Sequence, residues 1–168
     1  MKIILYMATT INGFIAKDND DTSWISKEEW DSYSAIVRKA GNVIIGHRTY
    51  DIITKQPEFS EFKDVKVVIV SNQNFTTLSP NHIIVHSPKE AIAVLQDFAE
   101  VIVAGGSILN TTFLSDHLID EIYVDIEPVV FGKGIPLFEN SDFESNLQLL
   151  GTKQISKNET QLHYKVIK

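Results

Sequence analysis

The sequence predicts a single three-layer α/β domain, residues 1–168, around a mostly parallel mixed sheet of about eight strands. Short apolar runs alternate along the chain with segments of helical periodicity, and strands separated by helices pair in parallel through right-handed crossovers. Two strand-like runs near the end are joined directly through Ser156 to Glu159, which predicts an antiparallel C-terminal hairpin. With 168 residues, of which 43% are hydrophobic, the chain has room for one core and not for two.

The first half of the chain contains one sharply delimited helix among short strands. Ser26 and Glu29 have the spacing of a capping box, in which each side chain caps the other residue's backbone N–H. A helix is therefore expected from about Lys27 to about Ala40, with Gly41 ending it. The strands expected around this helix are Lys2–Thr9, Asn42–Ile45 and Val65–Val70. An irregular loop through Gly13–Ala16 follows the first strand, and one short helical segment is expected at Arg48–Ile53.

The second half repeats the alternation of strand and helix. Ser87 and Pro88 combine an N-cap with proline at the first helical position, and a further helix is expected to open at Ser107. The strands expected in this half are Ile83–Val85, Val101–Ala104, Glu121–Ile126, Gln148–Ile155 and Gln161–Ile167.

Composition excludes several classes of partner. A net charge of −7 without a basic stripe argues against a nucleic-acid partner. No apolar run approaches the roughly 18 residues of a membrane span, and no secretory signal opens the chain, so we expect a cytoplasmic protein without a membrane partner. The absence of cysteine excludes disulfides and cysteine metal sites. No metal site is expected, because His82 and His86 fall in an extended segment.

Three loops follow expected parallel strands, at the sheet edge where ligands of open α/β folds bind. They are Gly46 to Thr49, Ser71-Asn72, and Gly105 to Ser107. Glycines let a ligand approach the backbone, and the N–H groups of a helix start attract phosphate. Each loop alone is an ordinary connection, but the three together predict a phosphorylated nucleotide cofactor.

Five segments, in order along most of the chain, resemble the dihydrofolate reductase-like superfamily, and within it the C-terminal reductase domain of the riboflavin biosynthesis protein RibD. The segments are ATTINGFIA (Ala8–Ala16), VIIGHRTYD (Val43–Asp51), VVIVSN (Val67–Asn72), VIVAGGSILNTTFL (Val101–Leu114) and IYVDIEPVVFGKGIPLF (Ile122–Phe138). The resemblance implies a dihydrofolate reductase-like fold and an NADPH-dependent oxidoreductase that acts on a small molecule. It also raises the expectation of a homodimer.

The resemblance further implies which residues hold NADPH. The Gly-Gly turn and the helix after it would hold the pyrophosphate, the loop after Gly46 the cofactor phosphates, the end of the next strand the adenosine, and the first strand and loop the nicotinamide. His47 stands where arginine is usual, and Arg48 beside it is expected to substitute. The cofactor-binding residues expected in this way are Ala8, Ile15, Gly46, His47, Arg48, Thr49, Ser71, Asn72, Gly105, Gly106, Ser107 and Ile108.

The residues that contact substrate and supply the proton are less well defined by the resemblance. Asn12 replaces the aspartate of the family's Ser-x-Asp-Gly motif, and Asn12, Trp24 and Asp125 are candidates for substrate binding. Folate-reducing relatives place an acidic residue shortly after a tryptophan on the first helix, and here Glu28 and Glu29 follow Trp24. The capping box accounts for Glu29, and Glu28 is expected to face solvent, so we expect water or substrate to deliver the proton.

The function expected is hydride transfer from NADPH to a pyrimidine- or pterin-type substrate, as in 5-amino-6-(5-phosphoribosylamino)uracil reductase of riboflavin biosynthesis. A zinc deaminase half is excluded, because its signature requires cysteine. The alternatives are a dihydrofolate reductase and a non-catalytic nucleotide-binding module. Dihydrofolate reductase is disfavoured, because this chain has no arginine after Arg48 to bind the folate glutamate.

Overall fold

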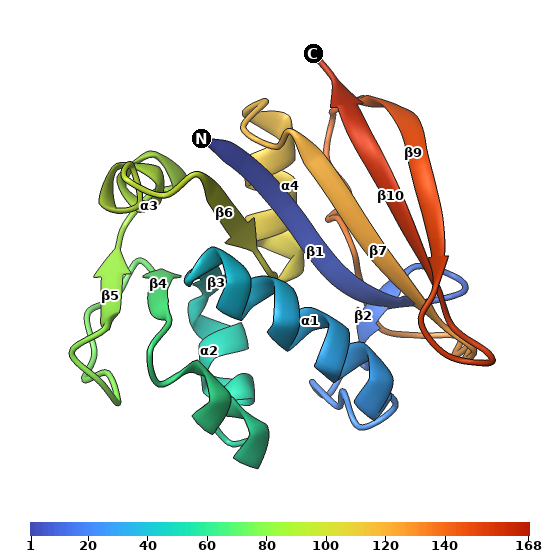
Figure 1. The fold of residues 1–168 in the computed structure, drawn as a ribbon, viewed down its shortest axis with the longest axis horizontal. Coiled ribbons are helices and arrows are strands. Elements are labelled where there is room, and N and C mark those ends of the chain that lie inside the picture. The colour runs from blue at the N-terminus through green and yellow to red at the C-terminus, as the bar shows by residue number, and fades with distance from the viewer.

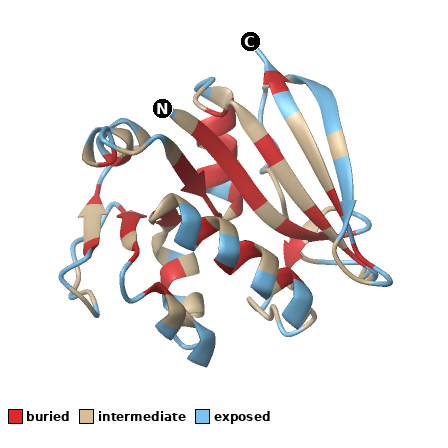
Figure 2. Cartoon of the chain, viewed as in Figure 1, coloured by how far each residue is buried: buried red, intermediate tan, exposed pale blue.

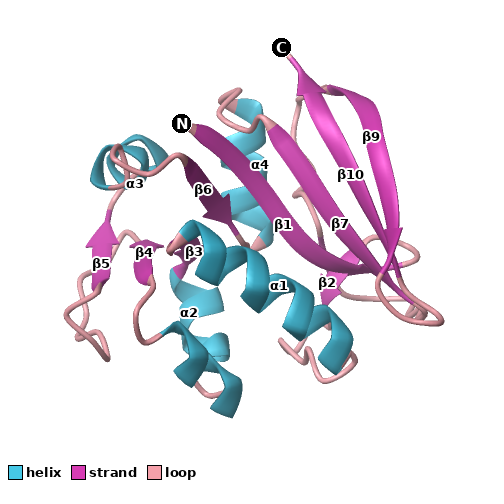
Figure 3. Cartoon of the chain, viewed as in Figure 1, coloured by secondary structure: helices cyan, strands magenta, loops and turns pink.

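The computed structural model describes all 168 residues, which build an eight-stranded sheet with helices packed on both faces (Figure 1, Figure 3). The strand order is β5-β4-β3-β6-β1-β7-β10-β9, and β10 alone runs opposite to the other seven strands. The strands are β1 (Lys2–Thr10), β3 (Asn42–Gly46), β4 (Lys66–Val70), β5 (His82–Val85), β6 (Glu100–Val103), β7 (Glu121–Glu127), β9 (Asn146–Gln154) and β10 (Thr160–Ile167). The predicted fold class and its C-terminal hairpin are confirmed.

The central strands separate two hydrophobic clusters, one under each helical layer. Helices α1 (Lys27–Ala40) and α2 (His47–Ile53) cover one face, and α3 (Pro88–Val94) and α4 (Ser107–Ser115) cover the other (Figure 1). Because side chains alternate along a strand, Ile4 and Tyr6 of β1 pack with Tyr33 of α1, whereas Leu5 packs with Phe113 of α4. Figure 2 shows the buried residues concentrated on β1 and β6, in the middle of the sheet.

Helix α1 has the bounds that its capping signals predict. The Ser26 hydroxyl oxygen accepts the backbone N–H of Glu29 at 3.0 Å, which is one half of the capping box. Gly41 ends the helix in the left-handed conformation, with φ of 72°, and its N–H donates to the carbonyl of Val37.

Two short features were not predicted. A separate two-stranded sheet joins β2 (Phe14–Ala16) to β8 (Ile135–Pro136), and a 3₁₀ helix, η1, spans Pro57–Phe62. Segments this short carry no readable periodicity, and β2 and β8 are brought together by tertiary packing, including stacked rings of Phe14 and Phe131. Among the helices, none has both the length and the apolar character needed to cross a bilayer.

Candidate functional site

A cleft of about 1240 Å³ opens at the carboxyl ends of β1, β3, β4 and β6, where the predicted loops meet. The structure brings nearly all of the expected cofactor-binding residues to its wall. They are Ala8, Ile15, Gly46, His47, Arg48, Thr49, Ser71, Asn72, Gly106, Ser107 and Ile108. Gly105 lies directly behind them, and its carbonyl accepts the N–H of Gly46 at 2.8 Å.

Two helices begin at glycine where the loops touch. Gly46 is the N-cap of α2 and Gly106 is the N-cap of α4, and neither helix start has a side-chain cap. The first backbone N–H groups of these helices are therefore left for solvent or a ligand. The hydroxyl of Ser107 is also buried without a hydrogen-bond partner. This end of the cleft collects unsatisfied donors, which is the chemistry that an anionic group requires.

The glycine turn leaves little space for side chains. Gly105 has φ of 89°, a conformation that strongly favours glycine, and a Cβ there would also make a tight 3.2 Å contact with the Met7 side chain. A Cβ on Gly106 would lie 3.4 Å from the hydroxyl oxygen of Thr49, on the cleft wall. The Gly105–Gly106 peptide bond is cis.

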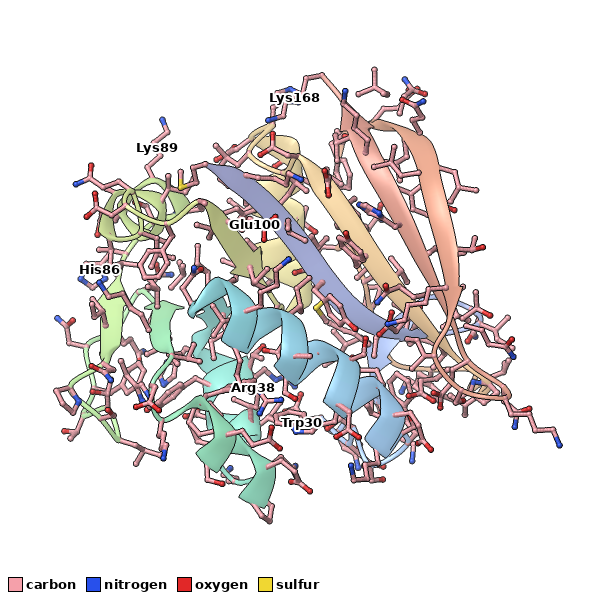
Figure 4. All side chains as sticks on the ribbon, viewed as in Figure 1. Trp30, Arg38, His86, Lys89, Glu100 and Lys168 are labelled. Atoms are coloured by element: carbon pink, nitrogen blue, oxygen red, sulfur yellow. The ribbon has the colours of Figure 1, made fainter.

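Imidazole rings flank the strand-end serine. The His47 ring stacks on Phe75 with centroids 4.0 Å apart, and its Nδ1 lies 3.4 Å from the Ser71 hydroxyl. His86 Nδ1 lies 2.7 Å from the carbonyl oxygen of Ser71. Both imidazoles line the cleft, and Figure 4 labels His86 beside β5, well away from Trp30 of α1.

Arg48 has a partner that the sequence did not reveal. Its Nε donates to Asp20 Oδ2 at 2.9 Å, and its Nη2 lies 2.7 Å from Asp20 Oδ1. Asp20 belongs to the loop between β2 and α1, which also lines the cleft. The guanidinium remains 66% exposed, so the loop neutralises this charge without burying it.

The structure corrects the interpretation of Glu29. The reciprocal half of the capping box is absent, because the N–H of Ser26 donates to Glu127 Oε1 at 2.7 Å and not to Glu29. The Glu29 carboxyl is instead buried, with 5% of the residue exposed, and it lines the cleft. Glu28 is exposed and lies outside the cleft, as expected.

The surroundings of Glu29 favour its neutral acid form. Burial raises the pKa of this carboxyl well above its ordinary value of 4.5, and the nearby carboxyls of Asp125, Glu127 and Glu159 raise it further. No hydrogen bond stabilises the ionised form. A cleft-lining carboxyl whose pKa is raised by burial and by neighbouring acids is suited to act as a general acid.

Asp125 lies beneath this acid and not in the cleft. It is 1% exposed, accepts a hydrogen bond from the hydroxyl of Tyr6 on Oδ2, and accepts another from Gln161 Nε2 on Oδ1 at 2.8 Å. Burial raises the pKa of Asp125, although both hydrogen bonds oppose the shift. The Tyr6 hydroxyl also lies 2.8 Å from the hydroxyl of Ser32 on α1. This network joins β1, β7 and β10 to the helix that carries Glu29.

The other two substrate candidates also lie outside the cleft. Asn12 donates from Nδ2 to the carbonyl of Phe131 at 2.9 Å, and its Oδ1 accepts from Thr10. Trp24 packs edge-on against Phe131 and donates to the carbonyl of Asp21 at 3.2 Å. In this conformation both side chains order the loops around β2 and β8 and do not face the cleft.

Residues 1–160 match the family model of the RibD C-terminal domain. The chain belongs to this family. It is 28% identical over 169 residues to the uncharacterized protein YwjB of Bacillus subtilis (strain 168), with 97% of each chain covered. In structure it is similar to a putative riboflavin biosynthesis protein from Shewanella sp. PV-4, with a TM-score of 0.81, 20% identity and complete coverage of both chains. It is also similar to dihydrofolate reductase from Enterococcus faecalis complexed with NADP(H), with a TM-score of 0.78 and 14% identity over 99% of this chain and 97% of that one.

In this RibD-type chain, the sequence indicated Glu29 and Asp125 as separate candidates but did not show that they belong to one group of acids. Asp125 and Glu127 are two residues apart on β7 and therefore point to the same face. Pairing of β7 with β10 then brings Glu159 and Gln161 alongside them. The hairpin register was the signal that would have found these residues, but it had to be combined with the position of α1 across the same face.

Proposed function

We propose that this protein is an NADPH-dependent oxidoreductase that delivers a hydride to a pyrimidine- or pterin-type substrate, as 5-amino-6-(5-phosphoribosylamino)uracil reductase does. The supporting observation is a single cleft with contrasting ends. Uncapped helix starts meet at Gly46 and Gly106, and a buried carboxyl with a raised pKa, Glu29, lines the same cleft. Membership of the RibD C-terminal domain family supports a reductase.

The residues present fit NADPH. The unpartnered Ser107 hydroxyl and the free N–H groups at the start of α4 would receive the pyrophosphate over Gly105 and Gly106. His47 would lie near the cofactor phosphates and Ser71 near the adenosine. Backbone donors suit a chain with a net charge of −7, because they attract phosphate without adding cations. When bound, NADPH supplies the hydride, so the chain has only to orient the reactants and move a proton.

Glu29 is the proposed source of that proton. Its carboxyl lines the cleft, lacks any capping role and holds its proton through burial and repulsion by neighbouring carboxyls. A positioned acid of this kind contributes about 10²- to 10⁴-fold to a proton-transfer step. This proposal replaces delivery of the proton by water or substrate, since the premise of that expectation, a Glu29 occupied in capping, does not hold.

Dihydrofolate reductase is the second candidate, because Glu29 lies on the first helix, shortly after Trp24, where folate-reducing relatives place their acid. No arginine follows Arg48 to bind a folate glutamate, which argues against it. Oxidation of NADPH, followed at its absorbance band, is measured with dihydrofolate and with a ribosylaminopyrimidine phosphate. Turnover of the pyrimidine alone supports the first candidate, and turnover of dihydrofolate alone supports the second. Tight NADPH binding without turnover of any substrate identifies a nucleotide-binding module.

The resemblance to RibD reductases also leads us to propose a cytoplasmic homodimer. Sedimentation equilibrium of the purified chain, with and without NADPH, tests the dimer. A monomer at micromolar concentration in both conditions contradicts it.

A further inference from the structure

A second pair of acids lies beside the candidate active site. Thr160 of β10 pairs with Ile126 of β7 in an antiparallel register, so the next positions along the ladder place Glu159 opposite Glu127. Both are buried, with 6% and 2% of the residue exposed. Like charges directly opposite each other on two strands repel, and two adjacent buried carboxylates do not both ionise.

The hydrogen bonding around the pair is incomplete without a proton. Glu127 Oε1 accepts the N–H of Ser26 at 2.7 Å, but Glu159 Oε2 is buried with no partner. No lysine or arginine forms an ion pair with either carboxyl. A proton held between the two carboxyls removes one of the two charges and supplies a donor where both side chains otherwise only accept.

We infer that Glu127 and Glu159 share one proton as a buried carboxyl pair, and that this pair holds the first turn of α1 and thereby positions Glu29. Ser26 is the N-cap of α1, and Glu29 is the third residue after it. The bond from Ser26 to Glu127 therefore ties the helix start to β7, below the cleft. Only the consequence for Glu29 rests on the proposed function; the shared proton does not.

The charged and titratable groups around these acids come from several elements. Besides burial, the pKa of Glu29 is raised by Asp125 and Glu127 of β7 and by Glu159 before β10. Burial raises the pKa of the phenols of Tyr6 on β1 and Tyr33 on α1, and the Glu29 carboxylate adds to the rise in both. On β9, the charge of Lys153 lowers the pKa of Asp125. Burial raises the pKa of Glu127, and Glu159 adds to that rise, whereas hydrogen bonding from Ser26 lowers it.

The shared proton is tested by counting protons released on unfolding. A carboxyl with a higher pKa in the folded state contributes stability that is full below the unfolded pKa and is lost as pH rises through the folded pKa. Urea unfolding is measured at intervals between about pH 5 and pH 8, and the slope of stability against pH gives the proton count. Glu159→Gln should release about one proton fewer than the wild type, because its amide supplies the donor permanently.

Matched variants make this count decisive. Glu127→Gln should remove the same proton, and the double variant should remove no more than either single change, whereas two independent acids would add. Glu144→Gln, an exposed acid, should leave the count unchanged. If Glu159→Gln does not fold, Glu127→Gln carries the same prediction. An unchanged count in either folded single variant, or additive losses in the double variant, overturns the shared proton.

The positioning role needs a different readout. Glu127→Met removes the acceptor for Ser26, whereas Glu127→Gln keeps an acceptor oxygen in the same place. We expect faster exchange of the Ser26 amide and at least tenfold slower single-turnover hydride transfer in Glu127→Met, with NADPH affinity unchanged and both properties retained in Glu127→Gln. Protected exchange together with unchanged transfer in Glu127→Met overturns the positioning role. If no substrate is reduced even by the wild type, the proposed function fails, while the proton count and the amide exchange still decide the inference.

Discussion

The two ends of the cleft differ in the groups that they present to a ligand. The glycine-turn end, around Gly46 and Gly106, offers backbone N–H groups, and its one nearby cation, Arg48, is paired with Asp20. The carboxyl end brings Glu29 over a buried group of acids, where each charge changes the protonation of the next. In the proposed function, the first end would bind the anionic cofactor through backbone N–H groups, and the second would control a proton through desolvation of Glu29. Changes at the first should therefore alter cofactor affinity, and changes at the second should alter the chemical step.

The largest effect is expected at the carboxyl end. Glu29→Gln keeps the size of the side chain but removes its transferable proton, so single-turnover hydride transfer should fall by about 10²- to 10⁴-fold. NADPH affinity should stay within about twofold of the wild type, because Glu29 is separate from the glycine turn. Glu28→Gln, at the exposed neighbouring position, is the control and should have little effect. Equal transfer rates in Glu29→Gln and the wild type would return proton delivery to water or substrate.

The next effect belongs to the glycine-turn end. Gly106→Val adds a branched side chain whose Cβ already lies 3.4 Å from the Thr49 hydroxyl oxygen, in the place proposed for the pyrophosphate. NADPH affinity, measured by calorimetry, should fall by about a hundredfold or more, since several charge-assisted hydrogen bonds are lost together. Gly151→Val on β9 is the matched control, because a Cβ there meets nothing within 4 Å. A folded Gly106→Val protein with normal affinity would remove the pyrophosphate from this turn.

The contrast also explains how much the sequence could predict. The turn at Gly105 to Ser107 is contiguous, and its order of strand, glycines and helix already indicates the backbone geometry. The capping box at Ser26 correctly predicted the start of α1, but the same pattern gave the wrong partner for Glu29. Spacing along a chain does not reveal that a carboxyl more than 100 positions away, Glu127, takes the Ser26 N–H. The ion pair of Arg48 with Asp20 was missed for the same reason, because Asp20 belongs to a loop that has no periodicity to predict its position.

A pH dependence should distinguish the ends as well. Only the acid form of Glu29 can donate, and its pKa is raised by burial and by the neighbouring acids. The rate of hydride transfer should therefore be constant below this raised pKa and should fall by about tenfold per pH unit above it. Stopped-flow measurement at saturating NADPH tests this, and the slow transfer that remains in Glu29→Gln should lack the same decline. A wild-type rate that rises with pH would require a base and would contradict the assignment of Glu29 as the acid.

The smallest effect concerns the loop that crosses between the two ends. Asp20 pairs with Arg48 on the cleft wall, so Asp20 would compete with the phosphates of the proposed NADPH for the same guanidinium. Asp20→Asn should tighten NADPH by no more than about fivefold, because exposed ion pairs contribute only about 0–1 kcal/mol. Asp18→Asn is the control, since Asp18 pairs with the exposed Lys133 and lies outside the cleft.

The affinity of Asp20→Asn for NADH shows which cofactor phosphate Arg48 contacts, the additional phosphate of NADPH or the shared pyrophosphate. If Asp20→Asn binds NADPH more tightly but NADH equally well, the guanidinium contacts the additional phosphate of NADPH. The preference for NADPH over NADH should then be lost in Arg48→Ala and His47→Ala. Equal gains for both cofactors assign Arg48 to the shared pyrophosphate, and no gain for either means that Asp20 does not compete with the cofactor.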